Sequence, residues 1–185
     1  MRIDYSVTKK TQFSNYSQVF WVLSIIPIFF LFSVFALEGG EFGIRLAIAV
    51  SLLTILLQVL PLYLLHMNYY DINKFDKLVC DFESRSISFY HGNDEINFKT
   101  DEIISVRYFM SFAKKNNTGG SLCWDNYNFC DIRLPDNKHV IITSLLVPNI
   151  DSLLEKMNVD KEKITQIPDV YSSVNKIALD ENFMK

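Results

Sequence analysis

Two long apolar runs, separated by only five residues, constrain this chain more than any other feature. Residues 19–37 contain no charged side chain, and residues 43–65 contain one, Arg45, close to the start of the run. A helix of 19 residues is about 28 Å long, which is close to the bilayer hydrocarbon thickness of about 30 Å. The two runs therefore predict two helices that cross a membrane as a tight hairpin.

The charges that flank the runs predict the orientation of this hairpin. The loop at residues 38–42 is acidic. Basic residues lie at the outer ends of both runs, namely Arg2, Lys9, Lys10, Lys74 and Lys77. Positive charge is enriched on the cytoplasmic side of membrane proteins, so both termini are expected in the cytoplasm. This orientation assumes a bacterial inner membrane, in which the chain is expected to be a multi-pass protein surrounded by membrane lipids.

A cleaved signal peptide is the alternative interpretation of the first run. However, the run is long, no small-residue cleavage site follows it, and the second run begins almost at once. These features favour two membrane spans.

A polar stripe interrupts the second run. Ser51, Thr54 and Gln58 have the spacing i, i+3 and i+7, which places them on one helix face. One interpretation is a hydrogen bond inside the hairpin, for example to a carbonyl freed by Pro27. The other is a self-association face or the lining of a pore, because polar side chains in a membrane seek partners.

Composition excludes several classes of function. The net charge of −3 does not suggest binding to nucleic acid. The three cysteines, Cys80, Cys123 and Cys130, have no metal-site spacing and are expected to be reduced thiols. There is no glycine-rich phosphate loop or nucleophile-elbow motif. We therefore expect no enzyme activity, no metal and no cofactor.

After the second run, apolar residues recur with a period of two, which is typical of strands. The pattern predicts antiparallel strands within residues 78–108 and again within 127–134 and 139–145. Turns are predicted at residues 91–94 and 135–137, and a polar loop at 113–121.

An amphipathic helix is predicted after Pro148, with Ile150, Leu153, Leu154 and Met157 on one face. A second short helix, broken at Pro168, is expected between Ile164 and Ile177. The fold class is thus an α-helical two-span transmembrane hairpin plus a small antiparallel β-barrel with a C-terminal helix. The chain is expected to consist of an N-terminal segment and hairpin (1–66), a cytoplasmic β-rich domain (67–159) and a polar tail (160–185).

The order of strands followed by one helix resembles that of a pleckstrin-homology-like (PH-like) domain. The segment 138–146, followed by a proline and a helix, is similar to bacterial PH-like domains, and the start at residues 1–8 resembles the YcxB-like bacterial proteins. The segment 66–71 departs from that pattern, because it is not basic.

The layout of two spans and a small β-rich domain is also similar to the two-transmembrane effectors of bacterial cyclic-nucleotide immune systems. That resemblance implies a domain that binds a cyclic nucleotide, forms a homo-oligomer and disrupts the inner membrane in anti-phage defence. It covers the layout and length of the chain and carries over no individual residue.

A ligand site for a cyclic nucleotide needs cations for phosphates and flat rings for bases. Candidates cluster around the polar loop: Arg107, Tyr108, Lys114, Lys115, Trp124, Tyr127 and Arg133. The alternative is that Lys114 and Lys115 are solvated and that Trp124 belongs to the core.

Two functions are therefore expected from the sequence. The first is a signal-gated membrane effector whose hairpins meet along Ser51, Thr54 and Gln58 when a ligand binds. The alternative is a non-catalytic PH-like anchor or scaffold that binds a partner protein or a lipid.

Overall fold

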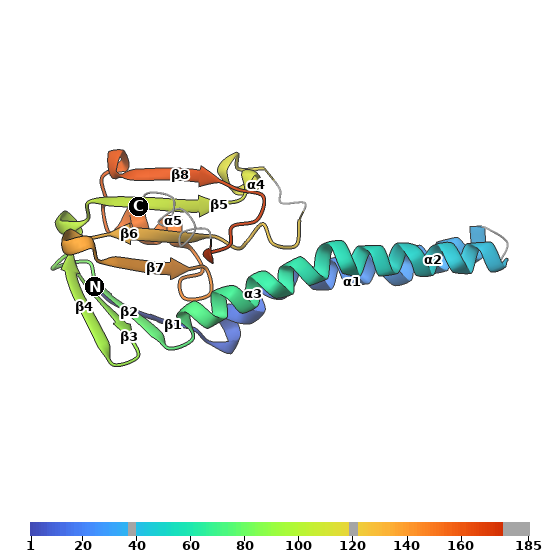
Figure 1. Ribbon diagram of the computed structural model, residues 1–185, viewed down its shortest axis with the longest axis horizontal. Coiled ribbons are helices and arrows are strands. Elements are labelled where there is room, and N and C mark those ends of the chain that lie inside the picture. Colours follow the sequence, from blue (N-terminus) through green and yellow to red (C-terminus); the bar gives the residue numbers. More distant parts are fainter. Residues whose placement is uncertain (37–39, 119–121, 176–185) are drawn as a thin grey trace.

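The computed structural model describes residues 1–36, 40–118 and 122–175. It contains two four-stranded sheets and a long helical hairpin that projects from one end of them (Figure 1). The first sheet has the order β1-β2-β3-β4, and the second has the order β7-β6-β5-β8. Neighbouring strands are antiparallel except β5 and β8, which are parallel.

The strand bounds follow the period-two pattern. The first sheet consists of β1 (Arg2–Ser6), β2 (Asp76–Asp81), β3 (Ser86–His91) and β4 (Asp94–Lys99). The second consists of β5 (Ser105–Met110), β6 (Phe129–Arg133), β7 (His139–Thr143) and β8 (Ile164–Pro168). Short 3₁₀ turns connect them: η2 (Thr100–Glu102), η3 (Pro135–Asn137) and η4 (Lys161–Lys163).

Both predicted hairpin turns are confirmed. Gly92, between β3 and β4, has φ +59°, a conformation that glycine adopts without steric cost. Asp136 and Asn137 also have positive φ, which Asp and Asn tolerate better than most residues.

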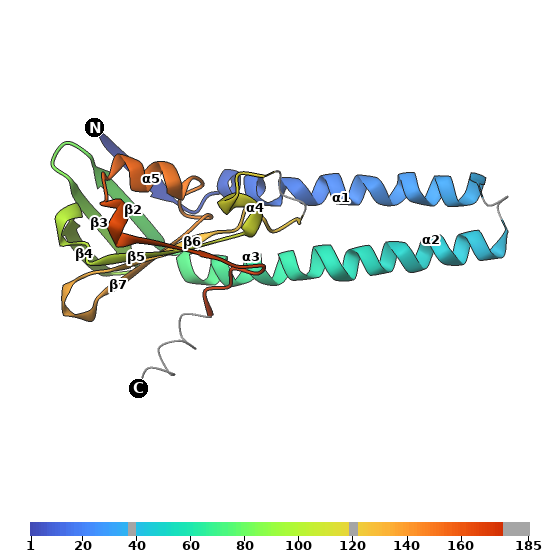
Figure 2. The same ribbon diagram turned by 90° about the horizontal axis from the view of Figure 1, so that it is seen from above.

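The helical hairpin is inserted between β1 and β2. Its first arm is α1 (Lys9–Ala36), and its second is α2 (Glu41–Thr54), the π-helical turn η1 (Ile55–Val59) and α3 (Leu60–Asn73). The arms lie side by side (Figure 2). Pro61 has no backbone N–H, so the helical hydrogen bond to the Leu57 carbonyl is absent. One residue earlier, the Leu60 N–H donates to the Ile55 carbonyl five positions back, which is the π-helical pattern.

The main core lies between the two sheets. Side chains from both sheets, including Leu78, Phe89, Val106 and Ile132, pack with the apolar face of α5 (Ile150–Lys156). Asn149 caps α5 by accepting a hydrogen bond from the Ser152 N–H. The helix predicted after Pro148 is therefore confirmed.

A second core joins the hairpin to the domain. Leu62, Leu65 and Tyr69 of α3 are fully buried against Phe129 of the second sheet and Tyr127. Two of the residues predicted to lie in a membrane span, Leu62 and Leu65, are thus buried in protein.

Several details differ from the sequence predictions. Residues 2–6 form β1, which no pattern indicated, and the helical arms begin earlier than residues 19 and 43. Residues 112–115 form the short helix α4 (Phe112–Lys115) at the start of the predicted polar loop. Leu37, Glu38 and residues 119–121 lie outside the described residues.

The short helix expected between Ile164 and Ile177 is replaced at its start by β8. The reason is tertiary: β5 has a free edge, and the β-branched residues Ile164, Thr165 and Ile167 pair with it. Ile177 lies outside the described residues.

Among the described residues, one helix, Glu41–Asn73, is long and apolar enough to cross a membrane. Only 11% of its most apolar window is buried within the protein.

Candidate functional site

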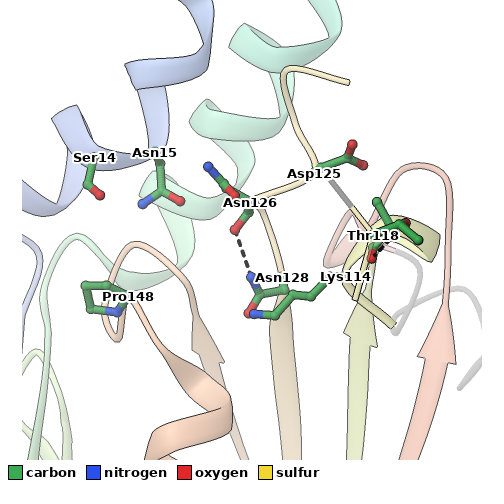
Figure 3. Close-up of a pocket in the computed structure, with 9 residues that line it drawn as sticks. Ser14, Asn15, Lys114, Thr118, Asp125, Asn126, Asn128 and Pro148 are labelled. Carbon is green, nitrogen blue, oxygen red and sulfur yellow. Dashed lines mark hydrogen bonds between the residues drawn. The ribbon is translucent and has the colours of Figure 1, made fainter. Parts of the chain in front are cut away.

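A polar cavity of about 370 Å³ lies where the hairpin meets the domain (Figure 3). Ser14 and Asn15 line it from α1, and Lys114 lines it from α4. The remaining wall comes from residues that precede β6 and from Pro148. A molecule bound there would therefore touch both the hairpin and the domain.

Hydrogen bonds hold the walls of this cavity in place. Ser111 caps α4 by accepting a bond from the Lys114 N–H, and its hydroxyl donates to the Asp125 carbonyl. The Asn15 amide donates to the Ser144 carbonyl at 3.3 Å, which fixes α1 to the loop after β7. Asn128 donates to the Asn126 carbonyl at 2.8 Å (Figure 3).

A partly buried polar network lies between this cavity and a second one. The Tyr108 hydroxyl lies 3.1 Å from Asn128 Oδ1 and 3.0 Å from Asp151 Oδ2, so its single proton can be shared with either. Lys114 Nζ lies 3.1 Å from the same Asp151 oxygen. Burial, followed by the charge of Asp151, raises the pKa of Tyr108, which therefore stays a neutral donor.

The second cavity, of about 670 Å³, lies beside α5 and β8. Tyr108 and Asp151 line it, together with Leu154 and Gln166. Because Lys114 and Asn128 line the first cavity, the network connects the two cavities.

Polar and aromatic contacts also tie the hairpin to the domain near the first cavity. His66 Nδ1 of α3 lies 2.8 Å from the Tyr127 hydroxyl, and the ring of Tyr16 lies 4.1 Å from that of His66. Burial raises the pKa of Tyr127. Asn73, fully buried at the end of α3, accepts a bond from the Thr143 N–H of β7.

The seven predicted ligand residues do not form one site. Tyr108 and Lys114 share the network described above, and Lys115 is exposed. Tyr127 is buried against His66, and Trp124 donates its indole N–H to the Val170 carbonyl at 2.7 Å.

The two predicted arginines lie on the other face of the second sheet, around Asp131. Arg107 donates to Asp131 Oδ2 through Nε at 2.9 Å and Nη2 at 2.7 Å, and Arg133 Nε lies 3.9 Å from the same oxygen. His139 Nδ1 lies 3.0 Å from Oδ1 of this fully buried carboxylate. Tyr108 and Arg107 are neighbours in β5, and neighbouring strand residues point to opposite faces.

The polar stripe lies on the half-buried side of the second arm. Gly43 and Ala47, on the same side, are buried where α2 packs on α1. The hydroxyls of Ser51 and Thr54 donate to carbonyls of their own helix, those of Ala47 and Val50. Gln58 Oε1 is buried and has no hydrogen-bond partner among the described residues.

The sequence analysis missed Asn15, Asn128 and Asp151. They lie in three segments far apart in the sequence, and only the fold brings Asn15 and Asn128 to one cavity and joins Asn128 to Asp151 through Tyr108. Among the described residues, no group of three or more His, Cys, Asp or Glu could hold a metal ion.

The family of the chain follows from a comparison with known families. A family model described as PH domain matches residues 4–156, from β1 through the hairpin to the end of α5. The chain belongs to this PH domain family. No curated protein and no solved structure matches this PH domain protein. The matched residues include the helical hairpin between β1 and β2.

Proposed function

We propose that this PH domain protein is a non-catalytic module anchored in a membrane by two spans of its hairpin. The observation that carries the proposal is the surface of the hairpin beyond the domain. Large apolar side chains there are exposed, among them Phe32, Phe35 and Leu52. Soluble monomers rarely expose contiguous apolar surface of this extent, because it costs free energy in water.

The charges support an orientation with both termini in the cytoplasm. Lys9 and Lys10 lie at the domain end of α1, and Lys74 follows α3. At the opposite tip, Glu41 pairs with Arg45. The proposal places this tip on the outer side of a bacterial inner membrane.

Cysteine labelling in intact cells tests both the insertion and the orientation. Glu41→Cys at the tip should react with a membrane-impermeant maleimide, whereas the exposed Glu95→Cys in β4 should react only after lysis. The three native cysteines are buried and provide a low background. Labelling of Glu95→Cys in intact cells, or extraction of the protein by alkaline carbonate, would contradict the proposal.

The cavity between α1 and α4 is the proposed ligand site, with a small polar molecule as its ligand. Its lining offers amide donors and acceptors together with the ammonium of Lys114. Cyclic nucleotides remain the specific expectation, since their phosphates would accept bonds from Lys114.

Thermal unfolding of the full chain in detergent, with cyclic mononucleotides and dinucleotides added, tests the ligand. A ligand that binds only the folded state raises the midpoint of unfolding. Lys114→Met should abolish this shift, whereas Lys115→Met, next to it and exposed, should retain it. The absence of a shift with any nucleotide would favour an anchor that binds a partner protein or lipid.

A second candidate function is the signal-gated effector, in which ligand binding drives oligomerisation and membrane disruption in anti-phage defence. The observation that favours it is Gln58, whose buried amide oxygen has no partner among the described residues. In an oligomer, the two arms would have to separate before a second copy could supply a donor to this oxygen. Cells that express such an effector should take up a membrane-impermeant dye. Gln58→Leu should abolish the dye uptake, whereas Leu57→Ala, exposed on the same turn, should leave it unchanged.

A further inference from the structure

The end of the domain from which the hairpin leaves exposes apolar side chains. Phe112 follows β5 and is 51% exposed, and Val170 follows β8 and is 59% exposed. Both strands point toward the hairpin in Figure 1, so both residues lie at that end. Lys115, at the end of α4, is also exposed. These three residues are called the hairpin-facing patch.

Two hydrogen bonds show where this patch lies along the length of the hairpin. The Tyr171 hydroxyl, next to Val170, donates to the Pro61 carbonyl at 3.0 Å. The Asp169 N–H donates to the carbonyl of Met110, two residues before Phe112, at 2.8 Å. The patch therefore lies close to the level of Pro61.

Pro61 is also where the domain stops covering the second arm. Leu62 is fully buried, whereas Leu60 and the large apolar side chains toward the tip, such as Leu56 and Leu52, are exposed. The uncovered part, residues 42–60, is about 28 Å long at the helical rise, which matches the hydrocarbon core of a bilayer. A hairpin that fills this core places Pro61 at the boundary between acyl chains and headgroups.

We infer that the hairpin-facing patch contacts the lipid headgroups of the bilayer that holds the hairpin, an inference that rests on the insertion proposed above. The aromatic ring of Phe112 and the side chain of Val170 enter the interfacial layer, where apolar and aromatic groups replace contacts with water. The ammonium of Lys115 binds lipid phosphates. The bilayer is the occupant because the patch lies near the level of Pro61, where the exposed apolar side chains of the second arm begin.

This contact has a consequence for the domain. Two helical arms alone would let the domain tilt over the membrane surface. With the patch on the headgroups, the cavity between α1 and α4, which Lys114 of the same short helix lines, is held close to the membrane.

Quenching of a fluorophore by nitroxide-labelled lipids tests the inference in the full chain, reconstituted in nanodiscs of phosphatidylglycerol and phosphatidylcholine. A solvent-sensitive maleimide dye is attached to Phe112→Cys, Leu52→Cys or Ile104→Cys, and unlabelled wild type serves as the blank. Ile104 is the matched control, because it is 58% exposed and precedes β5 at the opposite end of the domain.

Headgroup-level nitroxides should remove most of the fluorescence at Phe112→Cys and leave Ile104→Cys unchanged. Nitroxides deep in the acyl chains should quench Leu52→Cys. If Leu52→Cys is quenched and Phe112→Cys behaves like Ile104→Cys, the inference is overturned while the insertion stands. If Leu52→Cys is not quenched, the proposed insertion fails first, and the inference fails with it.

Discussion

The hydroxyl of Tyr171 donates a hydrogen bond of 3.0 Å to the carbonyl oxygen of Pro61, and 110 positions separate the two residues in the chain. This bond fastens the segment after β8 to the helix at the point where the domain stops covering it. Nearby, the Tyr69 hydroxyl donates to the Ser172 carbonyl at 2.6 Å. The C-terminal segment therefore holds α3 against the second sheet.

Tyr171→Phe should lower the free energy of unfolding by about 1 kcal/mol, because one net hydrogen bond is lost. Denaturant unfolding in detergent measures this loss of stability. Backbone hydrogen exchange in α3 should also become faster. Tyr90→Phe in β3 is the matched removal of a hydroxyl and should change neither quantity. Equal effects of the two substitutions would show that Tyr171 does not fasten the hairpin.

Asp131→Ala should lower the free energy of unfolding by about 3–5 kcal/mol, because Arg107 loses the partner of its largely buried charge. Adding Arg107→Met to this variant should recover part of the loss, since the unpaired charge is then removed. The exposed Asp101→Ala should have little effect. A double variant as unstable as the sum of the two single ones would contradict direct coupling between Arg107 and Asp131.

Ala47→Leu should destabilise the hairpin by about 1–3 kcal/mol, because Ala47 is fully buried where α2 packs on α1 and has no room for a larger side chain. Ala49→Leu makes the same change on the exposed side of α2 and should be neutral. Unfolding in increasing dodecyl sulfate measures both. A hairpin that tolerates both substitutions equally would not pack through Ala47.

The thiols should react slowly in the folded protein. Burial raises the pKa of Cys80 to about 12 and that of Cys130 well above its ordinary value. At pH 8 the thiolate fraction of Cys80 is then only about 10⁻⁴, and the thiolate is the reactive form. Absorbance assays with an aromatic disulfide should detect little reaction until denaturant exposes all three cysteines.

The same shift gives a pH dependence of stability. The unfolded thiols lose their protons near pH 9, whereas the folded Cys80 keeps its proton until about pH 12. The folded state therefore binds more protons in this window, and the free energy of unfolding falls as the pH rises from 9 to 12. Cys80→Ala should reduce this slope, and an unchanged slope would mean that other groups produce it.

The sequence by itself determined the local structure. The absence of charge in residues 19–37 predicts a helix there, and the alternation around Leu78 and Ile132 predicts strands that face a core. The turn at residues 135–137 and the helix after Pro148 also follow from short-range backbone preferences. Each of these features depends on interactions between residues only a few positions apart, so the sequence predicts it without the fold.

Only the tertiary structure decided which segments meet. β1 pairs Tyr5 with Leu78 across the whole hairpin, and β8 pairs with β5 in parallel. Asn15, Lys114 and Asn128 come together at one cavity for the same reason. Five-residue strands have weak signals of their own, and they are stabilised by a free sheet edge that exists only once the rest of the domain has folded.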